Sequence, residues 1–95
     1  MIARDFTENR IRQLVQLFPN IKCSYKFEDF SNTHFIEVVP NAVYDTSVEY
    51  AKAEERFISD FFDLNIPESI CFITDTSLVK MVDPSLVVQG NSESL

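Results

Sequence analysis

The chain contains a single glycine, Gly90, among its 95 residues. Loops that cradle a phosphate use several glycines, because only glycine lets the backbone approach the phosphate oxygens closely. The chain therefore has neither a dinucleotide fingerprint nor a P-loop. Its turns must also form without glycine, and asparagine is the other residue that readily adopts the left-handed conformation. Four asparagines stand at the expected breaks between elements: Asn20, Asn32, Asn41 and Asn65.

Residues that bind metals or act as nucleophiles are scarce. The chain has one histidine, His34, and two cysteines, Cys23 and Cys71, which are too few for a structural zinc site. The acidic residues lack the alternating spacing around a glycine that a calcium loop requires. Cys23 and His34 offer one thiolate–imidazole arrangement, but a cysteine in mid-strand is more often a small core residue. We therefore expect no metal, no cofactor and no catalytic residue.

The net charge of −7 is unevenly distributed. Residues 1–26 carry five basic and two acidic side chains, whereas residues 27–95 carry three basic and thirteen acidic ones. An acidic chain is a poor general binder of nucleic acid, since phosphate neutralisation supplies most of that affinity. A narrow nucleic-acid contact through the N-terminal cations remains an alternative; these are Arg4, Arg10, Arg12, Lys22 and Lys26.

No apolar run approaches the roughly 18 residues of a membrane span, and the polar N-terminus does not resemble a signal peptide. We therefore expect a cytoplasmic protein with reduced cysteines and no contact with a membrane.

Hydrophobic periodicity predicts a first helix over about residues 7–18, ended by Pro19. Its cap is either Thr7 or Asp5, the latter with Glu8 three residues on. Residues 21–27 alternate strictly between apolar and polar, and residues 34–39 continue as a second strand. Pairing Phe27 with His34 in a hairpin gathers the apolar side chains of both strands on one face. A slip of one residue would mix the two faces.

The second half of the chain predicts a long helix over 46–64, with Thr46 and Glu49 as its capping box. A nearly continuous apolar run at 69–74 is typical of a strand covered on both faces. Residues 78–82 suit either a short helix or a strand, residues 86–88 suggest a brief edge strand, and residues 89–95 are expected to fray.

These elements predict a single α+β domain over residues 1–95, built as a two-layer sandwich. Its order is α-β-β-α-β plus a mixed C-terminal segment, with an antiparallel hairpin and a right-handed βαβ crossover. We expect the first strand at the centre, with the second and third strands on its flanks, and both helices on the face of Cys23 and Tyr25.

The other sheet face would carry Phe35, Glu37 and Val39, which makes these residues a candidate interface. Either residues 76–95 fold back over this face, or another chain covers it, a second copy included. We expect a non-enzymatic protein-binding module of regulatory or neutralising type, whose partner is another protein. The alternatives are a small enzyme or enzyme subunit whose carboxylates converge only in the fold, and the nucleic-acid contact described above.

Overall fold

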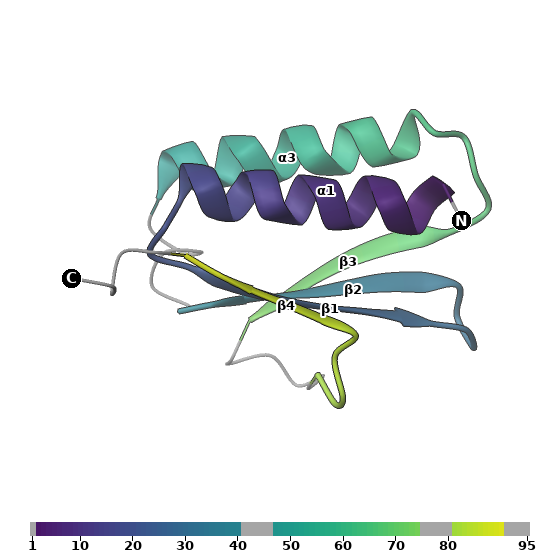
Figure 1. Ribbon diagram of the computed structural model, residues 1–95. Helices are drawn as coiled ribbons and strands as arrows, with labels where there is room; N and C mark the ends of the chain where they lie inside the picture. Colours follow the sequence, from purple (N-terminus) through teal and green to yellow (C-terminus); the bar gives the residue numbers. More distant parts are fainter. Residues whose placement is uncertain (1, 41–46, 75–80, 91–95) are drawn as a thin grey trace.

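Two helices cover one face of a mixed four-stranded sheet in the computed structural model (Figure 1). The structure describes residues 2–40, 47–74 and 81–90. The elements follow the order α1 (Ile2–Leu17), β1 (Lys22–Glu28), β2 (Thr33–Val39), α3 (Val48–Phe62), β3 (Ser69–Thr74) and β4 (Leu86–Gln89). The predicted α+β class and the order α-β-β-α-β are confirmed, and the C-terminal segment adds a fourth strand.

The hairpin of β1 and β2 has the predicted register. Phe27 lies opposite His34, and Tyr25 lies opposite Ile36. Side chains alternate between the faces of a strand, so the apolar set of both strands points to the helices. Cys23, Tyr25 and Ile36 are fully buried there.

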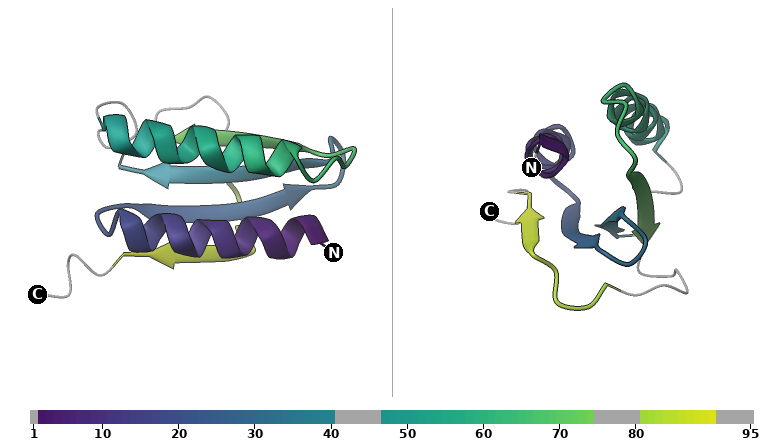
Figure 2. Two further views of the ribbon diagram at one scale, coloured as in Figure 1. Left: turned by 90° about the horizontal axis from the view of Figure 1, so that it is seen from above. Right: turned by 90° about the vertical axis from the view of Figure 1, so that its right-hand side faces the viewer.

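The strand order is β3-β2-β1-β4, which corrects one part of the predicted arrangement. β1 is central, but its second neighbour is β4 and not β3. β3 pairs in parallel with β2, because the right-handed crossover through α3 returns the chain to the outer edge of β2 (Figure 2). The apolar run of β3 therefore belongs to an outer strand of the described sheet, and Ile70, Cys71 and Phe72 are only half-buried.

Helix α1 begins five residues before the predicted start. Thr7 is not a cap: it lies inside the helix, is fully buried, and its Oγ1 has no hydrogen-bond partner among the described residues. The first turn is held by tertiary packing instead, since Ala3 is buried and the Phe6 ring packs against Phe57 and Phe61 of α3.

Helix α3 is capped one residue later than predicted. The Ser47 side chain accepts a hydrogen bond from the Tyr50 N–H, while Thr46 lies outside the described residues. The apolar stripe is as expected: Tyr50, Phe57 and Phe61 are buried against the sheet. The two helices run antiparallel above the strands (Figures 1 and 2).

The chain after β3 extends the sheet. Residues 75–80, which include part of the ambiguous segment 78–82, lie outside the described residues. β4 includes Gln89, which pairs with Lys22, and the Gly90 N–H donates to the Ile21 carbonyl (3.2 Å). Residues 89 and 90, predicted to belong to a frayed tail, are therefore hydrogen-bonded to the start of β1 and the residue before it. Residues 91–95 lie outside the described residues.

Candidate functional site

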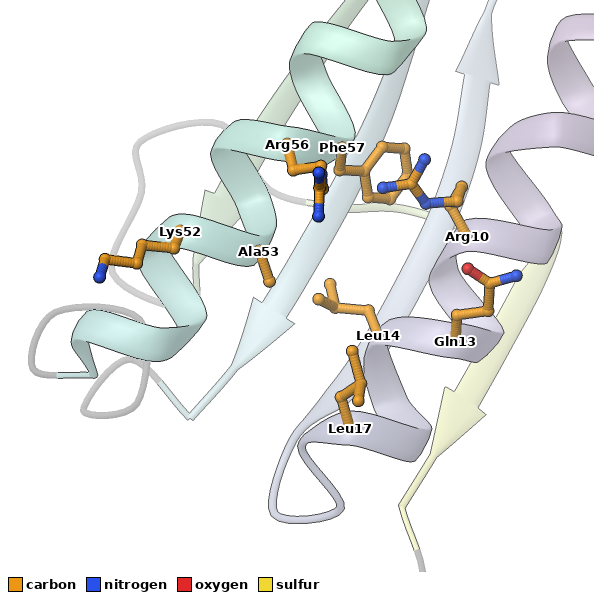
Figure 3. A pocket seen from close by; sticks show the side chains of 8 residues that line it. All are labelled: Arg10, Gln13, Leu14, Leu17, Lys52, Ala53, Arg56 and Phe57. Carbon is orange, nitrogen blue, oxygen red and sulfur yellow. The ribbon is translucent and has the colours of Figure 1, made fainter.

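A shallow groove lies between α1 and α3 on the side away from the sheet (Figure 3). Its volume is about 250 Å³, and its eight lining residues are Arg10, Gln13, Leu14 and Leu17 of α1 and Lys52, Ala53, Arg56 and Phe57 of α3. These residues recur at helical spacing on both helices, because each helix turns one face toward the other.

The floor of the groove is apolar. Leu14 and Phe57 reach it from the core, where both are buried, and Leu14 and Ala53 point toward each other across it (Figure 3). Leu17 completes the apolar surface at the end of α1 and is 70% exposed. The exposed side chain of Leu17 therefore extends the apolar surface of the buried Leu14 and Phe57 to the outside of the molecule.

Basic side chains border this floor along α3 and at the Arg10 end. Arg10, Lys52 and Arg56 line the groove, and none of the lining residues is acidic. Figure 3 shows Arg10 extending from α1 toward the Phe57 ring, while Lys52 extends from α3 away from α1. The groove is therefore locally positive in a chain whose net charge is −7.

Arg10 closes one end of the groove. Its Nη1 lies 2.6 Å from Oδ2 of Asp60 on α3, and its guanidinium carbon is 5.5 Å from the ring centroid of Phe6 and 5.3 Å from that of Phe57. These distances are within the range of cation–π attraction. Arg10 thus joins the two helices, and its charge is compensated within the molecule.

A second hollow of about 330 Å³ lies on the other side of α1. It is lined by Arg12, Val15, Gln16 and Pro19 together with Val88, Gln89 and Gly90 at the end of β4. Neither hollow is lined by a carboxylate. Across the described ranges, no group of histidine, cysteine, aspartate and glutamate side chains has the arrangement needed to hold a metal ion.

His34 forms a buried polar network that the sequence did not indicate. Its Nδ1 is 2.7 Å from the Tyr25 hydroxyl, and its Nε2 is 2.7 Å from Oε1 of Glu68. Assigning the ring proton to Nε2 satisfies both contacts: Nε2–H donates to Glu68, and Nδ1 accepts from the Tyr25 O–H. His34 does not lie at an edge of the described sheet: β2 lies between β1 and β3, and the imidazole is fully buried.

Burial is also the main cause that raises the pKa of the Tyr25 hydroxyl, with nearby Glu8 and Glu68 adding to the effect and Arg4 opposing it. Burial raises the pKa of the Cys23 thiol to about 12. Cys23 pairs with Val38, while both ring nitrogens of His34 are engaged elsewhere. The structure therefore does not join Cys23 and His34 into a nucleophile–base pair. Cys23 and Cys71 are free thiols.

The predicted interface residues Phe35, Glu37 and Val39 lie together on the sheet face opposite the helices, and all three are half-buried. The register places Cys71 beside Phe35 and Ile73 beside Glu37 on this open sheet face. Residues 81–85 pass on the same side (Figure 1), where Lys26 Nζ donates to the Val82 carbonyl (2.9 Å). Leu78 and Val79, expected in the intramolecular cover, lie outside the described residues.

The five N-terminal cations do not share one surface. Lys22 and Lys26 belong to the open sheet face, Arg10 lies in the groove and Arg12 lines the second hollow. The sequence analysis did not identify the groove, because hydrophobic periodicity places Lys52 and Arg56 on the polar side of the long helix. Their spacing of four residues within an acidic half of the chain is the signal that could have indicated it.

No family model, curated protein or solved structure matches the chain. Neither of the two described helices combines the length and the apolar character that crossing a bilayer demands.

Proposed function

We propose that the protein is a non-enzymatic, protein-binding module of regulatory or neutralising type, and that its partner docks on the groove between α1 and α3. The observation that carries this proposal is the exposed Leu17 beside Leu14, Ala53 and Phe57, with Arg10, Lys52 and Arg56 around them. An apolar centre with a polar rim is the usual composition of a protein–protein interface.

The size of the groove favours side chains of a partner over a small-molecule ligand. Its volume of about 250 Å³ is below the roughly 300–1,000 Å³ of pockets that enclose drug-sized ligands. It is also open along the helices, so a ligand would leave much of its surface in water. One or two apolar side chains of a docked segment would fill it.

The alternatives have less support. An enzyme would need a reacting group within reach of substrate, and the imidazole of His34 is fully buried between Tyr25 and Glu68. A nucleic-acid contact would need its cations on one surface, whereas Arg10 and Lys22 lie on opposite sides of the sheet. We further propose a cytoplasmic location, since both cysteines are free thiols and a reducing compartment keeps them so.

A site-specific photo-crosslinking experiment tests the proposal. A photoreactive residue replaces Leu17 in the groove, Phe30 in the β1–β2 turn or Val87 on the open sheet face, which are 70%, 97% and 50% exposed. The three proteins are then irradiated in the cells that make them. We expect one discrete protein adduct from position 17, absent from position 30.

The same experiment separates the two surfaces. An adduct between two copies of the chain at position 87, with none at position 17, would replace the groove with a homodimer through the open sheet face. Equal adducts at positions 17 and 30 would show random collision and contradict the proposal.

A further inference from the structure

We propose that the segment bound in the groove is an acidic amphipathic helix of the partner protein, an inference that rests on the proposed function. Its apolar side chains would lie on Leu14, Leu17 and Ala53, and its carboxylates would pair with Lys52 and Arg56. The charges and the spacing of the lining residues carry this inference.

The charge argument begins with Lys52 and Arg56, which are four residues apart on one face of α3. Neither residue has an ion-pair partner in the part of the chain that the structure describes. A partner carboxylate placed between them would therefore be attracted to both cations.

The net charge of −7 does not prevent an acidic segment from binding. At physiological salt the field of a charge decays over about 8 Å, so the cations that line the groove act on a docked segment more strongly than acidic residues on distant parts of the surface. All the ionisable groups among the lining residues are cations.

The spacing argument favours a helix as the bound segment. Leu14 and Leu17 are three residues apart on α1, and the pairs Lys52–Ala53 and Arg56–Phe57 are four apart on α3. A third helix presents side chains at the same intervals, so its apolar stripe can follow the groove. Ion pairing then falls toward the Lys52 end, because Asp60 accompanies Arg10 at the other end and would repel a carboxylate.

The test uses synthetic helical peptides of about four turns, roughly 15 residues. Each has the same leucine stripe, and its flanking positions are all glutamate, all glutamine or all lysine. Fluorescence anisotropy at 150 mM salt measures binding to the full chain and to two charge-reversed variants, Arg56→Glu in the groove and Arg12→Glu on the other side of α1. Both replaced arginines are exposed helical residues, and each variant changes the net charge equally.

We expect the glutamate peptide to bind tightest, and Arg56→Glu to weaken it about fivefold or more while Arg12→Glu changes it less than about twofold. Equal affinity of the glutamate and glutamine peptides, or equal losses of affinity in the two variants, would show that the bound segment is not acidic. Neither result would affect the crosslink at position 17. The absence of any binding by the glutamate peptide would overturn the acidic segment too. Loss of the crosslink itself would instead refute the proposed function.

Discussion

At the scale of single residues, His34 shows how a histidine can be buried with both of its ring nitrogens hydrogen-bonded. The Tyr25 hydroxyl and the Glu68 carboxylate engage its two ring nitrogens, and the rings of Phe27 and Phe61 pack around it. Each polar atom of the imidazole therefore exchanges water for a hydrogen bond within the protein. The burial of this polar group depends on both partners.

Removing one partner should be costly. Tyr25→Phe leaves Nδ1 of His34 buried without a donor, and we expect a loss of about 1–3 kcal/mol in the free energy of unfolding. Tyr50→Phe is the matched control, because the Tyr50 hydroxyl donates to the half-buried Glu54 (3.3 Å), and it should cost less than about 1 kcal/mol. Urea denaturation measures the free energy of unfolding of both variants. Equal losses would show that the His34 network adds nothing to the stability of the fold.

The buried thiol of Cys23 predicts a loss of stability in alkali. Burial raises its pKa from 9.0 to about 12, so between these pH values the folded state binds more protons than the unfolded state. The free energy of unfolding then falls as pH rises. The contribution is fully present below pH 9 and disappears toward pH 12, and Tyr25, whose pKa is also raised, acts in the same direction.

Urea titrations at several pH values above and below 9 measure this slope, and the variant Cys23→Val provides the comparison. We expect the variant to lose less stability across the alkaline range than the parent protein. Identical slopes would mean that Cys23 ionises in the folded state as easily as in the unfolded chain.

The roles of individual residues were partly predictable from the sequence. Alternation places Cys23 in the core as a small apolar residue, and the structure confirms it. The network of His34 was not predictable, because Glu68 is 34 residues away along the chain and reaches it only after the crossover through α3. Thr7 was misassigned for a related reason: the packing of Phe6 on α3 extends α1 beyond the local capping signal.

At the scale of elements, the turns show how the chain forms its connections with one glycine. Asn32 and Asn65 have φ of 51° and 59°, as their positions at the breaks predict. Asp83 adopts a similar φ of 51° and was not foreseen, since aspartate is a weaker signal of the left-handed conformation than asparagine. Gly90 itself has an ordinary φ, so a different constraint applies to it.

Position 90 requires glycine because the backbone there passes close to the backbone of Pro19. A Cβ at this position would lie 2.0 Å from the Pro19 carbonyl oxygen, so the end of β4 would have to move away from the α1–β1 connection. We expect Gly90→Ala to lower the free energy of unfolding by roughly 1–3 kcal/mol. Val87→Ala, in the adjoining strand β4 but half-exposed, is the control and should cost less; equal costs in thermal denaturation would contradict this account.

The hairpin register and the two helical stripes could be predicted because each depends on local periodicity. The position of β3 could not, since a single sequence does not specify which edge a crossover strand joins. The predicted sheet with β3 beside β1 is also compact, but in the structure β4 occupies that edge and excludes β3 from it.

At the scale of the whole molecule, the packing of the two helices creates the candidate binding surface. The sequence predicted the sheet face of Phe35, Glu37 and Val39 as the candidate interface. The fold instead brings Arg10 of α1 and Arg56 of α3 to the same groove, although they are far apart in the sequence. Because the groove is lined from both helices, the four-residue spacing of Lys52 and Arg56 on α3 could indicate its basic side but not its position against α1.

The central claim is that the partner binds between α1 and α3, and the most direct test compares Leu17→Asp with Val87→Asp. Both side chains are exposed, at 70% and 50%, so neither variant should unfold the protein. Calorimetric titration with the partner captured at position 17 measures the dissociation constant. We predict a rise of about tenfold or more for Leu17→Asp and of less than about twofold for Val87→Asp; the reverse order would place the interface on the open sheet face and contradict the account.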